Sequence, residues 1–251
     1  MHQAVLSRRN FKLNVLKYWR AAVCAIQALV CAYLGMGPHY AAAVGVVPET
    51  SAVLIDENSG EAAIKVRNTD AHPIILHTAI IDTKEDPARL IVATPLAARL
   101  EPGESQLVRF MLINKEPLKY ERMKRVVFEG LPPELSSHNA VDLIVRQDLP
   151  VIVKPAALPV DKEPWKRLTA QVRDGVVTLS NPSDYVVRLE QRAQILPQKT
   201  MVTLSRRYIL PGEQVLVGKA RQAGAKTIRL FPMTRYGYTA SAYDLQVTAS
   251  H

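Results

Sequence analysis

Residues 141–153 read VDLIVRQDLPVIV, and this stretch is the most informative part of the chain. Every odd position except Gln147 carries an aliphatic side chain, and the even positions are largely polar. Successive side chains of a β-strand point to opposite faces, so the pattern predicts one long strand with an apolar row on one face. Pro150 has no N–H to donate to a neighbouring strand, which favours an edge position.

Two interpretations of this strand are open at the sequence level. In the first, the strand is ordinary and its apolar row packs on the core of its own domain. In the second, it is an unusually long edge strand whose apolar row is a template for pairing with another chain. Used deliberately, such an edge can lend a strand to an incomplete sheet in another protein.

The rest of the chain after residue 43 indicates an all-β fold. Runs rich in Val, Ile and Leu are separated by turn signals at intervals of roughly 8–12 residues, as in a sandwich or barrel. The expected strands lie at residues 62–66, 74–81, 90–93, 106–113, 125–129, 168–172, 176–180, 186–189, 202–204, 214–217, 227–231 and 242–247. We find no internal repeat, and only residues 115–124 suit a short helical turn.

A proline-containing hinge divides this region. Residues 154–159 read KPAALP, in which two prolines flank small residues and stiffen the chain. We therefore expect two immunoglobulin-like β-sandwich domains, at residues 44–154 and 155–251, joined by a short hinge. Each has about the size of an immunoglobulin domain, roughly 100 residues.

Residues 1–43 have the order of a cleaved signal peptide. Five cations and no acid precede an apolar run at residues 21–36, and Ala41-Ala42-Ala43 fits the small-residue cleavage pattern. The run is shorter than the roughly 20 residues that span a bilayer, which disfavours a permanent anchor. We expect export to the periplasm. Ser7-Arg8-Arg9 half-matches a twin-arginine signal, so the export route stays open.

Charge and cysteine content exclude several classes. The formal charge is +9, but the five cations before residue 44 leave only +4 for the rest, where basic residues are interspersed with 23 acids. Nucleic-acid binding is therefore not expected. Cys24 and Cys31 both lie in the leader, so the mature chain has no disulfide or thiolate metal site.

No catalytic motif is present in the sequence. His72 and His77 are five residues apart, whereas two ligands on one strand face need an even spacing. Asp142 and Asp148 would lie about 20 Å apart along a strand, too far for a catalytic pair. We expect no enzyme activity, no metal and no cofactor.

Four motifs in the same order resemble the periplasmic chaperones that assemble pili. They are ATP at 93–95 with RLEPGE at 99–104 and QLVR at 106–109, Glu121 followed by FEGLPP at 128–133, LSNPSDYVV at 179–187, and Tyr236-Gly237. The resemblance implies two immunoglobulin-like domains. It also implies binding of pilus subunits by donor-strand complementation, and delivery of these subunits to an outer-membrane usher.

The same resemblance implies roles for particular residues. Val141, Leu143 and Val145, with Leu149 beyond them, match the row that is donated to the subunit. Arg109 and Glu121 match two members of a charged cluster between the domains. The third member, normally an Asp, is Arg235 here, so we expect at most an Arg109–Glu121 pair.

A second departure concerns the anchor for the subunit's C-terminal carboxylate. The two basic residues used by better-known members correspond to Ala52 and Pro150, which cannot bind an anion through their side chains. A buried carboxylate without a partner is costly, so we expect a relocated cation. Arg125 is the first candidate and Lys154 the second, with Arg109 behind them.

Two other functions compete with the chaperone interpretation. One is a secreted two-domain adhesin or carbohydrate-binding module, but only 6% of the residues are aromatic. The other is a structural pilin, which would be a single incomplete domain. Whether the free protein covers its own strand edge as a homodimer, and which subunit it binds, stay open.

Overall fold

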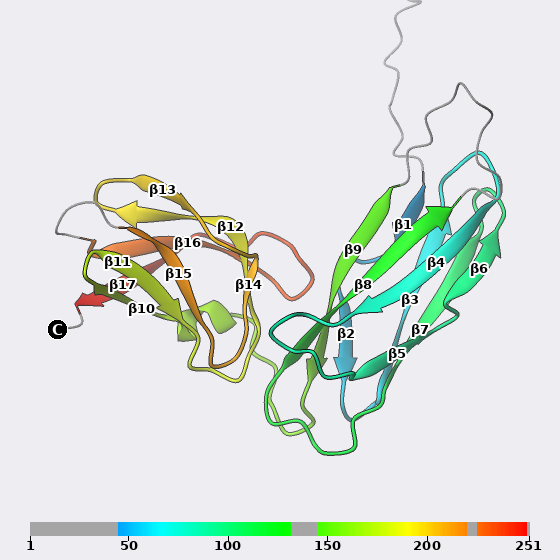
Figure 1. Ribbon diagram of the computed structural model, residues 1–251, viewed down its shortest axis with the longest axis horizontal. Coiled ribbons are helices and arrows are strands. Elements are labelled where there is room, and N and C mark those ends of the chain that lie inside the picture. Colours follow the sequence, from blue (N-terminus) through cyan, green and yellow to red (C-terminus); the bar gives the residue numbers. More distant parts are fainter. Residues whose placement is uncertain (1–44, 132–144, 220–224, 250–251) are drawn as a thin grey trace, which may run out of the picture. The chain divides into compact units, whose positions relative to one another are not determined.

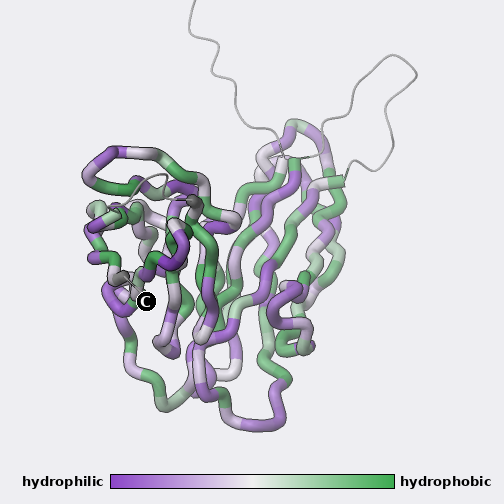
Figure 2. Tube along the Cα trace, turned by 60° about the vertical axis from the view of Figure 1, so that its left-hand side comes forward, coloured by the Kyte–Doolittle hydropathy of each residue, from purple (hydrophilic) through white to green (hydrophobic). Residues whose placement is uncertain are grey.

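Alternation of apolar and polar residues produces strands throughout the part of the chain that the structure describes. This computed structural model describes residues 45–131, 145–219 and 225–249. The alternation is visible along the strands in Figure 2. In β3 (Glu61–Asn68), for example, the buried positions Ile64, Val66 and Asn68 alternate with exposed ones. The expected leader at residues 1–43 lies outside the described residues.

The first sandwich consists of two sheets (Figure 1). Their strand orders are β1-β3-β7-β5 and β2-β9-β8-β4-β6. Besides β3, the strands are β1 (Val46–Pro48), β2 (Val53–Asp56), β4 (Ile74–Ile81), β5 (Ile91–Thr94), β6 (Ala97–Leu100), β7 (Ser105–Leu112), β8 (Arg122–Leu131) and β9 (Arg146–Lys154). Neighbouring strands are antiparallel except for β2 and β9, which are parallel.

The second sandwich is built from one continuous sheet with the order β13-β12-β16-β17-β10-β11-β15, and β14 pairs with β12. Its strands are β10 (Thr169–Arg173), β11 (Val176–Ser180), β12 (Val187–Leu196), β13 (Thr200–Thr203), β14 (Tyr208–Ile209), β15 (Gln214–Lys219), β16 (Thr227–Met233) and β17 (Tyr243–Ala249). A Cβ added to Gly218 would lie 3.5 Å from Val202, so the end strands β13 and β15 approach each other.

Each sandwich has its own apolar core. Phe110 and Phe128 are fully buried in the first core, and Trp165, Val187 and Leu230 belong to the second. A small third cluster consists of Met123, Ile152 and Val186, from both sandwiches. The two cores agree with the predicted pair of β-sandwiches.

The helical turn expected at residues 115–124 is wrong, since this segment is irregular up to the start of β8. Among the residues that the structure describes, the helical element is a short 3-10 helix, η1 (Pro164–Arg167), which begins with a proline where no N–H is needed. The strands β1, β2, β6 and β14 were not predicted. Each has four residues or fewer, which is too short to show a periodic pattern.

Asn68 closes one corner of the first sandwich. Its side-chain amide donates to the backbone carbonyls of His72, Leu100 and Glu101 at 3.0–3.2 Å, and it is fully buried. Its backbone carbonyl accepts a bond from Gly103, in the turn that follows Leu100. A single amide thus serves three carbonyls, of which that of Leu100 would otherwise be buried without a partner.

Asn181 closes a corner of the second sandwich in the same way. Its side-chain amide donates to the carbonyls of Tyr185 at 2.8 Å and Ile209 at 3.1 Å, and the residue is 1% exposed. Its backbone carbonyl accepts a bond from Gly212, in the turn after Ile209. The sequences EPGE at 101–104 and LPGE at 210–213 are therefore equivalent turns.

Candidate functional site

The strand β9 has one edge that is only partly covered. On one side it pairs with β8 along its length, from Arg146 to Val153. On the other side β2 pairs only with residues 151–154. Among the described residues, no strand is hydrogen-bonded to this side between Arg146 and Pro150. This segment is therefore an open edge of the sheet and a template for a further strand, although the carbonyl of Asp148 accepts a bond from the Arg125 side chain at 3.2 Å.

The predicted donor row is divided by the structure. Val141 and Leu143 lie outside the described residues. Val145 is half-buried and lies next to Gly45, where an added Cβ would be 3.4 Å from the Val145 Cβ. Leu149 is 6% exposed and packs in the core of the first sandwich. For Leu149, packing on the domain's own core is thus the correct interpretation.

Three arginines surround a cavity of about 240 Å³ beside the open edge. They are Arg125 on β8, Arg188 on β12 and Arg207 between β13 and β14. The remaining lining residues include Ser51, Met123, Asp148, Pro150 and Gly237. We call this cavity the arginine pocket. Its lining holds three guanidinium groups and a single carboxylate.

Arg188 has no acidic partner among the residues that the structure describes. Its Nη1 donates to the backbone carbonyl of Arg235 at 3.0 Å. Burial lowers the pKa of Arg188, and the positive charges of Arg125 and Arg207 lower it further. The side chain is therefore held in a positively charged surrounding, where an anion would be stabilised.

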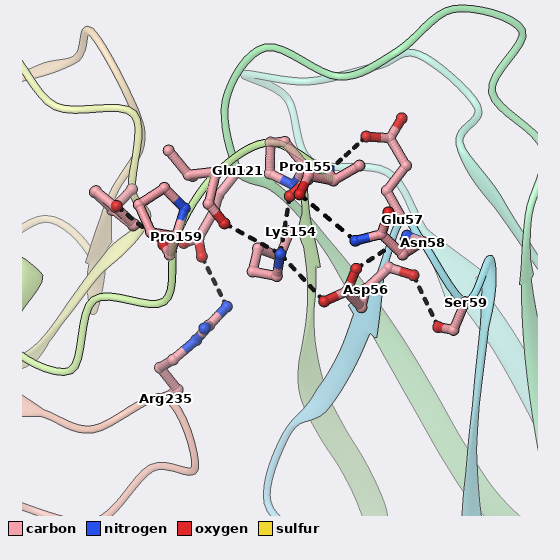
Figure 3. A network of polar contacts seen from close by, with 12 residues as sticks. Asp56, Glu57, Asn58, Ser59, Glu121, Lys154, Pro155, Pro159 and Arg235 are labelled. Atoms are coloured by element: carbon pink, nitrogen blue, oxygen red, sulfur yellow. Dashed lines mark hydrogen bonds and ion pairs between the residues drawn. The ribbon is translucent and has the colours of Figure 1, made fainter.

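Arg125 and Lys154, the candidates predicted from the sequence, both have partners. Arg125 belongs to the arginine pocket, but its Nε donates to Asp148 at 2.7 Å. The Lys154 Nζ lies 3.1 Å from Asp56 and donates to the carbonyls of Pro155 and Leu158 at 3.0 and 3.1 Å (Figure 3). All three donors of Lys154 are thus engaged inside the chain.

Ala52 and Pro150 are both buried. Neither has a side-chain group that could bind a carboxylate, so the cation would have to come from elsewhere. Arg188 and Arg207 were missed at the sequence level because each is one cation among many. Their spacing in the sequence follows no recognisable motif, and the fold alone brings the two arginines close to Pro150.

The predicted pair of Arg109 and Glu121 is wrong. Arg109 is exposed on β7, between Ala63 and Thr94. Glu121 pairs instead with Arg235, whose Nη2 donates to it at 2.7 Å (Figure 3). Arg235 does not disrupt the cluster, because it is the partner of the acid.

Glu121 is almost fully buried, at 3% exposure. Its other oxygen accepts a bond from the backbone N–H of Val186 at 2.9 Å, and its own N–H donates to Asp184. Burial raises the pKa of Glu121, against the opposing charge of Arg235. Glu121 therefore connects the start of β8 to the second sandwich through both its side chain and its backbone.

Within residues 45–131, 145–219 and 225–249, no group of His, Cys, Asp and Glu is arranged to hold a metal ion. The same residues contain no helix with the length and apolar character needed to cross a membrane.

Two β-sandwiches in tandem, each with its own core, define a protein of the two-domain immunoglobulin-like class. Residues 45–159 match the family described as "Pili and flagellar-assembly chaperone, PapD N-terminal domain". The chain is 40% identical over 203 residues to a protein of Escherichia coli (strain K12) described as an uncharacterized fimbrial chaperone, YhcA. That match covers 80% of this chain and 90% of the relative. The chain belongs to the family of fimbrial chaperones.

Solved structures show the same fold at low sequence identity. The SafB chaperone of Salmonella enterica, solved with the SafA pilin, gives a TM-score of 0.68 at 17% identity, over 82% of this chain and 97% of the other. The CupB2 chaperone of Pseudomonas aeruginosa gives 0.66 at 17% identity, over 80% of this chain and 100% of the other.

Proposed function

We propose that this chain binds pilus subunits and stabilises them by donor-strand complementation. The observation that carries the proposal is the open edge of β9 between Arg146 and Pro150. An incoming strand can pair there through main-chain hydrogen bonds, and alternate side chains then supply specificity. The complex of the SafA pilin with the SafB chaperone supports a pilin as the bound chain.

The donated apolar row consists of Val141, Leu143 and Val145 in this proposal. Leu149 is excluded because its side chain fills the core of the first sandwich. The row would occupy the groove that an unpartnered subunit exposes, and would prevent that subunit from aggregating through its edges.

We place the anchor for the subunit's C-terminal carboxylate in the arginine pocket, with Arg188 as the principal ligand. An incoming strand that follows the open edge ends at Pro150, because β2 occupies the same side from Val151 onward. Pro150 lines the arginine pocket, so the end of that strand would enter it. Arg188 can bind an anion there without first breaking an ion pair, whereas Arg125 must leave Asp148.

The cellular location and the next partner are inferred from the family and from the predicted leader. The chain would be exported to the periplasm after removal of residues 1–43, and would pass its subunits to an outer-membrane usher. It would catalyse no reaction. In the absence of a subunit, a second copy of the chain could cover the same edge, and the molar mass of the free protein in solution decides this point.

Co-expression with pilins from the same genome tests the proposal. We expect a one-to-one complex that survives gel filtration. Changing Val141, Leu143 and Val145 together to Asp should abolish it, because three charges cannot enter the apolar groove of a subunit. A complex that persists with this triple variant overturns strand donation.

The anchor is tested separately by Arg188→Ala. Removal of a charge-assisted hydrogen bond should weaken subunit binding roughly 10- to 100-fold. The matched control is Arg173→Ala, at an exposed position of β10 outside the pocket. Arg125→Ala should weaken subunit binding less, since Arg125 is already paired with Asp148. If Arg188→Ala binds subunits as the wild type does, the anchor lies elsewhere, although strand donation can still hold.

A further inference from the structure

We propose that a basic groove on the first sandwich binds an acidic, extended peptide segment of a partner protein. The groove is lined by residues 89–90, residues 113–120 and Arg122, and its cavity has a volume of about 620 Å³. It shares no lining residue with the arginine pocket or with the open edge of β9. The proposed function does not use it.

The lining of the groove carries an excess of positive charge. Arg89, Lys115 and Lys119 are exposed, and none of them has a hydrogen bond or ion pair with any of the residues described. Arg122 is neutralised by Asp86, which leaves Glu116 as the acid of the lining. Clustered cations in a hollow surface concentrate the electric field and attract an anionic partner.

Apolar groups lie between these cations. Ile113 is 43% exposed and Tyr120 is 44% exposed, although both are large. Leu90 is buried and Leu118 is half-buried beside them. A ligand that matches this lining has acidic side chains next to aliphatic or aromatic ones, as an extended peptide segment can offer.

The groove is held in shape before any partner arrives. One oxygen of Glu57 accepts bonds at 2.9 Å from the Leu118 N–H and from the Asn114 side chain. Burial acts to raise the pKa of Glu57, but these bonds and one from the Ala156 N–H outweigh it and lower the pKa. Since the segment is already ordered, binding loses less conformational entropy.

The hollow form favours a peptide over a membrane surface. A protein that binds anionic lipid usually presents an amphipathic face whose apolar side enters the bilayer. Here the apolar side chains line a cavity whose volume falls in the range of about 300–1,000 Å³ that is common for ligand sites. An extended peptide segment can lie in such a hollow with its side chains against these apolar groups.

The test uses the whole chain and a fluorescent synthetic peptide in which aspartate alternates with leucine. Fluorescence anisotropy should show saturable binding that weakens as salt is added. The double variant Lys115→Glu with Lys119→Glu should weaken binding at least about tenfold, because like charges then face each other. Amide shifts in a labelled sample should change within residues 113–119.

The matched control is Lys162→Glu with Arg173→Glu, which changes the net charge equally at two exposed positions outside the groove. It should bind the peptide as the wild type does. Equal loss in both double variants, equal binding of a peptide with asparagine in place of aspartate, or no binding of the peptide at all would each overturn the proposal. So would groove-dependent binding to phosphatidylglycerol vesicles without binding to the peptide.

Discussion

Asn68 in the first sandwich and Asn181 in the second hold equivalent corners. Each donates to the backbone carbonyl four residues later and to a carbonyl just before a Pro-Gly-Glu turn. Each backbone N–H also donates to the glutamate carbonyl of its turn, at Glu104 and Glu213. The two corners differ in what surrounds them.

The turn of the second sandwich has an additional ionic connection. Glu213 pairs with Arg206, and Arg206 also pairs with Glu85 of the first sandwich. Glu104 has no such partner among the residues described, and its side chain accepts only the Glu101 N–H. A shared hydrogen-bonded corner thus specifies the fold in both halves, while charged neighbours give one of them a second connection.

The largest difference in stability between the two sandwiches should appear when Asp86 in the first and Asp244 in the second are each changed to Asn. Asp86 is buried between Arg122 and Lys124, and Lys124 is itself fully buried. Asp86→Asn leaves Arg122 without its counter-charge and leaves the buried Lys124 with Asp82 alone, so it should cost about 3 kcal/mol in the free energy of unfolding. Asp244→Asn breaks an exposed pair with Arg229, so its effect should be far smaller and should vanish in salt. Urea unfolding measures both.

Acid should remove the stability that Asp86 contributes. Burial acts to raise the pKa of Asp86, but Arg122 and Lys124 outweigh it and hold the pKa below its usual range. The stability that Asp86 contributes is therefore present above the usual aspartate range, and is lost as the pH falls through its lowered value. Asp86→Asn should flatten this acid-induced loss. An unchanged pH profile would contradict the assignment.

Substitution of the two corner asparagines should have the next largest effect on stability. Asn68→Ala and Asn181→Ala should each cost about 2–3 kcal/mol, because buried carbonyls lose their donors. The loss should be larger for Asn181, because both of its bonds to carbonyls are buried, whereas only the bond of Asn68 to Leu100 is. Hydrogen exchange read separately in each sandwich measures this, with exposed Asn58→Ala as the control. If exchange rises equally in both sandwiches for either variant, the corners do not act locally.

Replacing the turn glycine by alanine should lower the stability equally in the two turns. Gly103 and Gly212 have φ of 78° and 73°, where only glycine is unstrained, and a Cβ meets no atom within 3.4 Å at either. Alanine should therefore cost about 1 kcal/mol at each site, through backbone strain alone. Gly237→Ala provides the contrast, since its Cβ would lie 2.7 Å from the Ser51 Oγ. Thermal midpoints that differ between the two turns would reject their equivalence.

The smallest effect on stability concerns Glu121. At this residue burial outweighs the neighbouring charges, whereas at Asp86 the neighbouring cations outweigh burial. Burial dominates and raises the pKa of Glu121, so its favourable contribution is present at low pH and is lost as the pH rises through the raised value. The Val186 amide donates to this carboxylate and should report its titration by NMR, with a midpoint above the usual glutamate range. Glu121→Gln should abolish that step. A midpoint at or below the usual range would contradict the assignment.

Strands with several alternating residues were predictable, and the corners were not. Periodicity predicts β3 and β4 because each is eight residues long and one face of each enters a core. The corners at Asn68 and Asn181 could not be predicted, because each consists of one asparagine and a turn about 30 residues later, with unrelated residues between them. Such a pattern has no local signal and depends on which carbonyls become buried.

The sequence indicates the strand of the candidate site and one of the three arginines of the pocket, Arg125, but not the other two. Residues 141–153 identify the strand that contains the open edge, and Pro150 marks where that edge ends. Arg188 lies on another domain, and nothing near it in the sequence indicates that β12 brings it to the first sandwich. The role of Arg235 is not apparent from the sequence for a related reason, because its partner Glu121 lies 114 residues earlier in the chain.

The partial cover that β2 gives to β9 divides one strand into two segments that should tolerate substitution differently. Residues after Pro150 pair with β2 and fill the core, so they must change together with the rest of the sandwich. Residues 146–148 lie before the buried Leu149 and are exposed or half-buried, so they can change without repacking that core. Grafting this segment from a relative such as YhcA should therefore exchange partner preference while leaving foldability intact, because the two properties are encoded in adjacent parts of the same strand.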